Sequence, residues 1–539
     1  MQLLNSGMKF ESNTEYIAQD KVIDVYFENA FSCDNKEVLA STRTYAEKFP
    51  VGFLLENIEN TVLDFNNATV VFHGRIVPFI LINCKNVVIK NLKIDYDRPF
   101  YTQADVLAVR DNKMEIKICD GFDYAIKNGF LYAKSETWEQ NLNKNNCLLW
   151  LYDKSHTKKY PITLGLFGDE IFPTENPPLP IIQLKIEEND GKQIISGDFP
   201  KEWEYNDGNN VLLITHEVRD KNTITLIGGS DITVENCILI HGAAMGIVGM
   251  HTKNITIDRF SMYRDYDGNG RMVTNNADAI HCFNCYGKIV IKDCYMEGLL
   301  DDAVNIHSNY FSVKEINGNV LTMYSHSVEY TANSVWFCAG DTISVSKGRT
   351  NEKVTDLKIT DIKIDDKNNV QYFTVEGDTS AISLDDTVEN VSAQPEVYIK
   401  NCTFGEFRGT MRLQSGNKTV IEDCIFANKE TSLLFTGDTS YWFEAGPVRN
   451  MQIKNCTFKN SGPTPRFDIF TEIEFTENSN YYHGNIVVED CVFEDCSNIA
   501  ALRHAENIVF RNNSYEKESY ITEEVCKNIS ADTNIKVLK

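Results

Sequence analysis

A short motif recurs along the chain and decides the fold. It reads DITVENCIL at residues 231–239, KIVIKDCYM at 288–296 and EVYIKNCTF at 396–404. It returns as TVIEDCIF at 419–426, NMQIKNCTF at 450–458 and NIVVEDCVF at 485–493, with weaker copies at 86–94, 254–262 and 507–515. Each strong copy joins an alternating apolar strand to a polar pair that ends in Asn or Asp, followed by Cys. A short unit repeated in this way indicates a solenoid.

The distance between copies gives the length of one coil. Cys237 and Phe260 are 23 residues apart, and Cys402 and Cys424 are 22 apart, which suits one coil of a parallel β-helix. Because each coil stacks on its neighbours, the recurring Cys should form an interior ladder of reduced packing residues. The Asn or Asp before it suits a turn between sheets. We therefore predict an all-β, right-handed parallel β-helix.

The repeat is interrupted twice, at residues 97–226 and 309–394. Both stretches are rich in β-branched and aromatic residues, so we expect two small barrel-like β domains inserted into the solenoid and no disordered segment. The predicted organisation is an N-terminal cap with the first coils (1–96), insertion one (97–226), central coils (227–308), insertion two (309–394), and C-terminal coils with a cap (395–539). A helical cap is expected at 36–48.

Charge and hydropathy exclude several classes of partner. The chain has 52 Lys+Arg against 77 Asp+Glu, a net charge of -25, which opposes binding to nucleic acid and to anionic membranes. No stretch reaches the ~18 apolar residues of a membrane helix. The first residues lack a basic and then apolar leader, so we expect a cytoplasmic protein or a secreted one whose signal was removed. The long sides of a solenoid leave monomer and homodimer both open.

Three aspartates carry the candidate chemistry. The chain reads NNADAIH at 275–281 and LDDAVNIH at 300–307, so Asp301 and Asp302 follow Asp278 after about one coil. Residues one coil apart lie about 4.8 Å from each other. At that distance two carboxylates repel by about 3 kcal/mol at an effective dielectric of about 20. A glycosidase benefits, because one carboxyl must stay protonated while another is ionised.

The aspartates could also have a structural role or bind a metal ion. Paired aspartates are common in turns, and Asp ladders cap solenoid coils. Three carboxylates are also hard oxygen ligands that suit calcium. The pair Cys282 and Cys285 lacks the second pair that a zinc site requires, and the odd total of 15 cysteines does not indicate a disulfide scaffold.

Five motifs in order resemble glycoside hydrolase family 110, the α-1,3-galactosidases. They are the three aspartates with Asn305 and His307, FILINCKNVVI at 79–89, IDYDRP at 94–99 with Gln103, Arg408-Gly409, and WFEAGP at 442–447. The resemblance spans about residues 50 to 515. Ser308 stands where the family's pattern has Gly.

The resemblance implies a hydrolase of terminal α-1,3-linked galactose, as on blood group B glycans or linear α-galactosides, that inverts the anomeric centre without metal or organic cofactor. By analogy with other β-helix glycosidases, Asp301 is the expected general acid, and Asp278 and Asp302 hold and deprotonate the water. On a regular strand Asp301 and Asp302 would point to opposite faces, so both can reach the substrate only if they lie at a bend or bulge. The expected substrate-binding residues are Asn305, His307, His281, Arg408, Trp442 and Glu444. His281 and His307 could equally be buried structural imidazoles, and Trp442 a buried anchor.

Two other functions remain open at this point. A polygalacturonase-like hydrolase would use a similar set of aspartates but needs cations for galacturonate, and no Arg-x-Lys pair follows at the expected place. A non-catalytic glycan-binding β-helix would show an exposed aromatic stripe without converging carboxylates.

Overall fold

The structure is a computed structural model. It describes residues 2–35, 48–142, 147–155, 163–167, 181–203, 208–216, 221–325, 337–365, 367–437, 439, 442–459, 462–471, 475 and 481–539. In these ranges the regular elements are β-strands and two short 3-10 turns, η1 (Phe27–Asn29) and η3 (Lys201–Trp203). The helical cap expected at 36–48 lies outside the described residues, apart from its last position.

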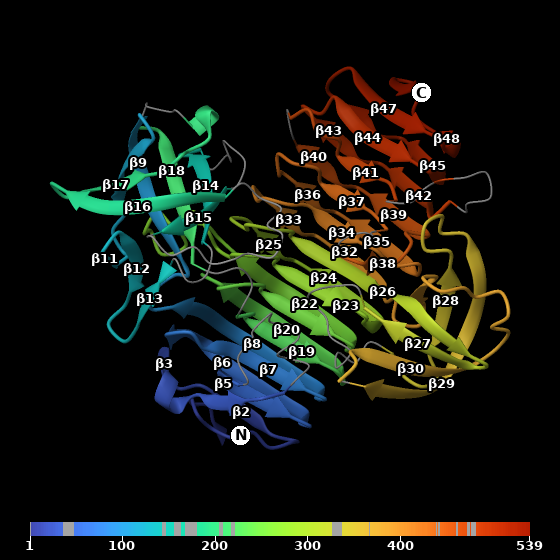
Figure 1. The fold of residues 1–539 in the computed structure, drawn as a ribbon, viewed down its shortest axis with the longest axis horizontal. Helices are drawn as coiled ribbons and strands as arrows, with labels where there is room; N and C mark the ends of the chain where they lie inside the picture. The colour runs from blue at the N-terminus through green and yellow to red at the C-terminus, as the bar shows by residue number, and fades with distance from the viewer. Residues whose placement is uncertain are drawn as a thin grey trace.

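The first long sheet of the solenoid stacks strand on strand from one end of the molecule to the other (Figure 1). Its strands are parallel. They are β1 (Gln2–Leu3), β2 (Glu15–Ile17), β3 (Val22–Tyr26), β6 (Glu59–His73), β8 (Lys85–Tyr96), β20 (Ser230–Leu239), β22 (Lys253–Met262), β24 (Tyr286–Lys292), β25 (Tyr295–Met296), β32 (Glu396–Lys400), β33 (Thr403–Phe404), β35 (Lys418–Glu422), β36 (Ile425–Phe426), β39 (Asn450–Lys454), β40 (Thr457–Lys459), β42 (His483–Glu489), β43 (Val492–Glu494), β45 (Ala505–Arg511), β46 (Ser514–Tyr515) and β48 (Lys527–Ser530).

The second long sheet holds the strands next to the aspartates. Apart from the first pair, its neighbours in the solenoid are parallel. They are β4 (Phe31–Cys33), β5 (Phe49–Glu56), β7 (Val77–Ile82), β19 (Ile224–Ile227), β21 (Ile247–Met250), β23 (Ile280–Phe283), β26 (Val304–Asn317), β34 (Met411–Leu413), β37 (Leu433–Phe435), β41 (Phe467–Ile469), β44 (Asn498–Arg503), β47 (Ser519–Glu524) and β49 (Ile535–Leu538). The short β38 (Glu444–Ala445) pairs with β26.

The first sheet turns a corner at the Asn or Asp before each repeat Cys. Asn236, Asp293 and Asn401 have φ of 49°, 56° and 52°, a left-handed backbone that Asn and Asp tolerate better than other side chains. At these corners the side chains also bond from coil to coil, since Asn401 Nδ2 donates to Asp293 Oδ1 at 2.7 Å. A second set of left-handed asparagines, near the starts of the strands, does the same: Asn528 Nδ2 donates to Asn507 Oδ1 at 2.9 Å. The predicted turn role of this position is confirmed.

The core of the solenoid is built from the residues that flank these corners. All 15 cysteines are free, and those of the repeat are buried, which confirms their predicted packing role. Two positions after the Cys, an aromatic ladder stacks with ring centroids 4.8–5.2 Å apart: Phe404, Phe426, Phe458, Phe493 and Tyr515. A large apolar side chain contributes about 1.5–3 kcal/mol when it is fully buried, so the ladder stabilises each coil against its neighbours.

Insertion one is a closed barrel joined to a small sheet. The barrel order is β10 (Lys113–Ile118), β17 (Lys192–Ser196), β16 (Ile181–Asn189), β15 (Thr163–Phe167), β14 (Cys147–Asp153), β18 (Asn210–Thr215) and β9 (Tyr101–Arg110). The small sheet is β11 (Tyr124–Lys127), β12 (Phe130–Lys134) and β13 (Glu139–Asn141). The apolar core of the barrel includes Met272, Val273 and Leu300 of the solenoid, so the barrel is docked beside the aspartates.

Insertion two grows directly out of β26. The strands β27 (Val320–Tyr324), β30 (Val370–Glu376), β29 (Lys353–Asp365), β28 (Thr342–Ser346) and β31 (Thr387–Asn390) close an antiparallel ring with the distal half of β26. After the insertion the chain resumes the same coil stacking: Tyr295, before the insertion, pairs in parallel with Thr403, after it.

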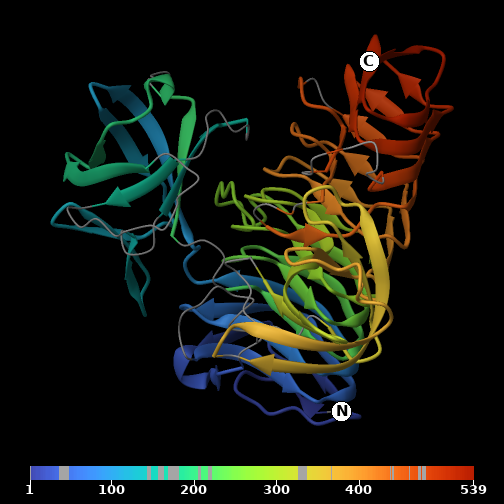
Figure 2. The ribbon, with the colours of Figure 1, turned by 45° about the vertical axis from the view of Figure 1, so that its right-hand side comes forward.

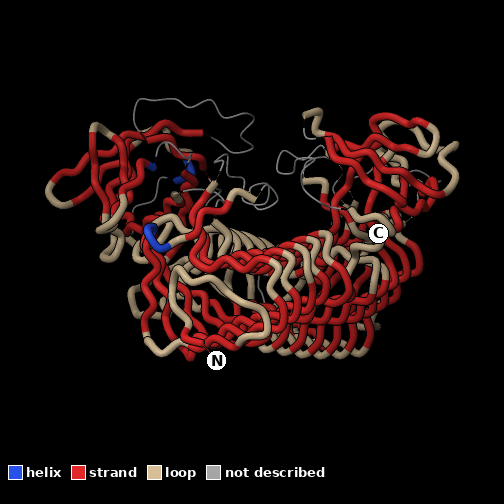
Figure 3. The backbone as a smooth tube through the Cα atoms, turned by 90° about the horizontal axis from the view of Figure 1, so that it is seen from below, coloured by secondary structure: helices blue, strands red, loops and turns tan. Residues whose placement is uncertain are grey.

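In the view of Figure 3 both insertions rise above the solenoid, one at the left and the other at the right, and Figure 2 shows the second insertion in front of the coils and the first beside them. The predicted fold class, a parallel β-helix with two inserted small β domains, is confirmed. In the described part of the chain, no helix is long and apolar enough to span a membrane.

Candidate active site

The three aspartates lie where two neighbouring coils enter the second sheet. Asp278 precedes β23, and Asp301 and Asp302 occupy the bend that precedes β26. The ladder pairs Ile280 with Val304, an offset of 24 residues (304 minus 280), so Asp278 is level with Asp302. The Ala279 N–H donates to the Asp302 carbonyl at 3.0 Å.

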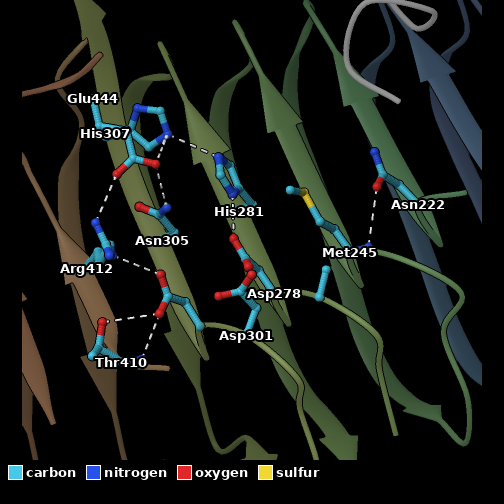
Figure 4. A network of polar contacts seen from close by, with 12 residues as sticks. Asn222, Met245, Asp278, His281, Asp301, Asn305, His307, Thr410, Arg412 and Glu444 are labelled. Carbon is cyan, nitrogen blue, oxygen red and sulfur yellow. Dashed lines mark hydrogen bonds and ion pairs between the residues drawn. The ribbon is translucent and has the colours of Figure 1, made fainter. Parts of the chain in front are cut away.

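The structure brings the three carboxylates together. One oxygen of each lies within 4.8 Å of the others. Asp278 and Asp302 are 2% and 6% exposed, and Asp301 is partly exposed. Figure 4 shows Asp278 and Asp301 side by side, with His281 above them. This spacing makes simultaneous ionisation of all three unfavourable.

Asp302 is held by donors from the coil beyond the second insertion. Its Oδ1 accepts the Thr410 N–H at 2.7 Å and the Thr410 hydroxyl at 3.2 Å, and its Oδ2 pairs with Arg412 Nε at 3.0 Å. Burial raises the pKa of Asp302, as does Asp278, while the attraction of Arg412 opposes that rise. Gly409 makes the approach possible: it has φ of 103°, and a Cβ there would lie 2.7 Å from Asp302 Oδ1.

Asp301 is linked to the first insertion through Arg408. The Arg408 Nη1 donates to Asp301 Oδ1 at 3.1 Å, and the guanidinium lies 5.5 Å from the ring centroid of Trp150. Trp150 belongs to β14 and is only 2% exposed. Its indole N–H has no hydrogen-bond partner among the described residues. The inserted barrel therefore forms part of the wall beside Asp301.

His281 and His307 form a series of contacts that leads from Asp278 into the interior of the protein. The Nδ1 of His281 lies 2.6 Å from Asp278 Oδ2, and its Nε2 lies 3.0 Å from Nε2 of His307. The Nδ1 of His307 lies 2.7 Å from the Ser308 carbonyl oxygen. Burial lowers the pKa of His307 to about 4, so this imidazole is neutral at neutral pH.

Glu444 closes the upper edge of the network in Figure 4. Its Oε1 accepts Asn305 Nδ2 at 3.1 Å and lies 3.6 Å from His307 Nε2, and its Oε2 lies 3.5 Å from Arg412 Nη1. Burial would raise the pKa of Glu444, but His307 and Arg412 outweigh it, and the pKa is lowered. Because His307 is itself neutral, Arg412 is the cation that keeps Glu444 ionised. Trp442 lies two residues earlier and is partly exposed.

Three members of this site were not anticipated from the sequence: Arg412, Thr410 and Trp150. Asn305 and Arg412 are register partners, yet they are 107 residues apart in the chain (412 minus 305). Arg412 could have been found by continuing the coil register across the second insertion. Trp150 has no such signal, because it reaches the site from a separate barrel.

Comparison with known proteins finds a matching β-helix family model and relatives that are named as galactosidases. The family model described as "Right handed beta helix region" matches residues 380–537. A protein of Shewanella woodyi named alpha-1,3-galactosidase A is 29% identical over 76% of this chain, and the chain spans 65% of that relative's length. Alpha-1,3-galactosidase A of Bacteroides fragilis is 27% identical over 91% of the chain and 80% of the relative.

A third relative has the same kind of name. Alpha-1,3-galactosidase B of Bacteroides thetaiotaomicron is 24% identical over 89% of this chain and 79% of the relative. Among solved structures, a polygalacturonase of Erwinia carotovora covers 98% of this chain and 90% of its own, with 10% identity and a TM-score of 0.37. The matching family model and the parallel coil topology make the chain a right-handed β-helix protein. The predicted resemblance is confirmed: this chain is homologous over most of its length to curated proteins named alpha-1,3-galactosidase.

Proposed function

We propose that this protein is an exo-acting glycoside hydrolase that removes terminal α-1,3-linked galactose from blood group B-type or linear α-galactoside glycans, with inversion of configuration. One observation carries the proposal: three carboxylates lie within 4.8 Å of one another, in a chain homologous to curated proteins named alpha-1,3-galactosidase. Hydrolysis of a glycosidic bond requires carboxyl groups with different protonation states at one place.

Asp301 is the proposed general acid. It is the most exposed of the three, so it can reach the glycosidic oxygen of a sugar that enters from solvent. Asp302 accepts two hydrogen bonds from Thr410 and pairs with Arg412, which suits a carboxylate that is ionised when it takes a proton from water. Asp278 faces the same water from the neighbouring coil.

Sugar binding falls to the rim of the site. Arg408 and Trp442 are partly exposed, and we propose that they contact galactose hydroxyls and its apolar face. Glu444 and Asn305 are bonded to each other and would align the far side of the ring. His281 and His307 are buried behind Asp278 and Glu444, which they approach to 2.6 and 3.6 Å, so their proposed effect on the sugar is exerted through these carboxylates.

Retention of configuration is a second candidate for the stereochemical outcome of the reaction. Inverting glycosidases hold their two carboxyl groups about 6.5–9.5 Å apart, and retaining ones about 5–5.5 Å apart. The 4.8 Å spread of the nearest oxygens favours retention, whereas the family resemblance implies inversion. Proton NMR of the first anomer of galactose released decides between them: β-galactose supports inversion, and α-galactose supports a covalent intermediate on Asp302 or Asp278.

The activity test measures galactose release from α-1,3-galactobiose, the fucosylated B trisaccharide and α-1,4-galactobiose. We expect release from at least one α-1,3 substrate by the wild type and loss of release in Asp301→Asn, with EDTA having no effect. Asp111→Asn, an exposed change in the first insertion, is the matched control and should retain wild-type activity.

Other outcomes lead to the alternative functions. Absence of release from all three galactosides would refute the galactosidase proposal. Release of galacturonate from polygalacturonan would then support a polygalacturonase-like hydrolase, and binding to a glycan array without turnover would support a glycan-binding protein. Loss of activity in EDTA would instead indicate that a cation bridges the three carboxylates.

A further inference from the structure

The chain of contacts from Asp278 to Ser308 needs more protons than neutral side chains supply. Three contacts follow one another: Asp278 Oδ2 to His281 Nδ1, His281 Nε2 to His307 Nε2, and His307 Nδ1 to the Ser308 carbonyl, at 2.6, 3.0 and 2.7 Å. Both ends of the chain are oxygens, and the Ser308 carbonyl only accepts. Each contact at such a distance requires one proton between its two heavy atoms.

Two neutral imidazoles carry two protons between them, one each. The third contact therefore needs a third proton. The count does not depend on how the tautomers are assigned. If His307 gives its proton to Ser308, His281 must donate to His307, and its Nδ1 then faces Asp278 as a bare acceptor. A lone pair opposing a carboxylate at 2.6 Å in a buried site would be strongly unfavourable.

The surroundings decide where the third proton stays. His307 is a poor place for it, because its side chain is fully buried and its pKa is lowered to about 4. The titratable groups facing this chain are Asp302 and the protonated Asp301 at the Asp278 end, and Glu444 and Arg412 at the His307 end. The negative charge on Asp302 opposes a second full negative charge on Asp278. The proton is therefore shared between Asp278 and His281.

We infer that Asp278 and His281 together hold one extra proton in the resting site, so that Asp278 orients the water and Asp302 is the base. This inference rests on the proposed glycosidase function and assigns roles within it. A bound proton here does the work that a cation would do among three clustered carboxylates. It also makes His281 a positioning residue that acts on the reaction through Asp278.

The reaction balances with this assignment. Asp302 removes a proton from the water while the water oxygen forms a bond to the anomeric carbon. The bond from that carbon to the leaving oxygen breaks, and Asp301 donates its proton to that oxygen. One proton has then moved from Asp301 to Asp302, and it returns across the short gap between them once galactose has left. The proton on Asp278 and His281 is neither consumed nor released.

The first test needs no substrate. Capillary electrophoresis of the folded full-length protein at pH 7 measures net charge. Asp278→Asn should leave the charge unchanged, because the neutral amide replaces a pair that is already neutral. Asp111→Asn, which removes an exposed carboxylate, should shift it by about one unit in the same experiment. A shift of one unit for Asp278→Asn would overturn the inference, whatever the enzyme cleaves.

The second test compares two variants in galactose release. Loss of a general base lowers kcat by about 10²–10⁴-fold, and we expect this for Asp302→Asn. For Asp278→Asn we expect a loss of about tenfold, with KM little changed, because Asn donates to His281 as the protonated pair does. Asp278→Asn as inactive as Asp302→Asn would overturn the inference. If the wild type releases no galactose, the proposed function fails while the electrophoretic result still decides the protonation.

Discussion

Glu389 of β31 is a buried carboxyl whose titration is tied to the stability of the second barrel. Its Oε2 accepts the Tyr482 hydroxyl at 3.1 Å, and the Tyr482 oxygen in turn accepts the Tyr310 hydroxyl at 2.6 Å and the Gly446 N–H at 2.8 Å. Burial raises the pKa of Glu389 to about 7 from 4.5, against the Tyr482 hydrogen bond and more distant cations. The cluster holds the loop that carries Glu444.

The perturbation is Glu389→Gln, and its size follows from the pKa. A carboxyl whose pKa is higher in the folded state stabilises the protein below its unfolded pKa of 4.5, and this contribution is lost as pH rises through 7. The difference of about 2.5 pKa units corresponds to about 3 kcal/mol. Scaled to 539 residues, the entropy of unfolding is about 1.1 kcal/mol/K, so the wild type should lose about 3 °C in Tm between pH 4 and pH 8.

The assay is thermal unfolding at several pH values, followed by circular dichroism. Glu389→Gln should lack this pH-dependent loss, so that the variant overtakes the wild type above pH 7. The matched control is Glu376→Gln on β30 of the same barrel, where the carboxylate is exposed and the wild-type pH profile should persist. Parallel profiles for the wild type and Glu389→Gln would refute the proposed burial of a protonated carboxyl.

Three further predictions concern the site, the ladder and acid stability. Gly409→Ala should lower kcat at least tenfold while the fold is retained, because its Cβ would press on Asp301 and Asp302, which we propose to be catalytic; Gly129→Ala, also at positive φ but with nothing within 4 Å, should keep full activity. Cys456→Ser should lower the free energy of unfolding by about 1–3 kcal/mol, since it buries a hydroxyl in an apolar ladder, whereas exposed Cys338→Ser should change it little in a urea titration. Burial lowers the pKa of His483 to about 3, so stability present above pH 6.5 should fall as pH drops toward that value, and His483→Gln should flatten a Tm profile between pH 6.5 and 4.

The coils were predictable because their constraints are local and repeated. The interior Cys and the preceding Asn or Asp recur with the coil, so position in the motif predicts both burial at Cys424 and a left-handed corner at Asp423, with φ of 57°. The same logic placed Asp278 close to Asp301 and Asp302. The one-residue difference between spacing and register, 23 against 24, cannot be read from the motif, because it depends on how the bend before β26 is formed.

The rest of the site depends on tertiary contacts that interrupt this local logic. Arg412 follows from the coil register only when that register is continued across the second insertion. Glu444 reaches the site from β38 and Trp150 from the first insertion, so their distances to the aspartates depend on how these segments dock. The burial of His281 and His307 was left open between two readings for the same reason. An imidazole on a coil strand is exposed or buried depending on what packs against it, and here Glu444 of β38 lies 3.6 Å from His307 Nε2.

The asparagine bonds at the corners have a consequence for how such a protein can change its length. Each bond joins equivalent positions of successive coils, so duplication of one whole coil after β42 would leave every donor with an acceptor and lengthen the rod by about 4.8 Å. Duplication of half a coil would break the series everywhere beyond it. A coil is therefore an exchangeable cassette. The C-terminal part of the rod can grow or shrink in evolution by whole cassettes while the two coils that carry the aspartates, and the barrels beside them, keep their geometry.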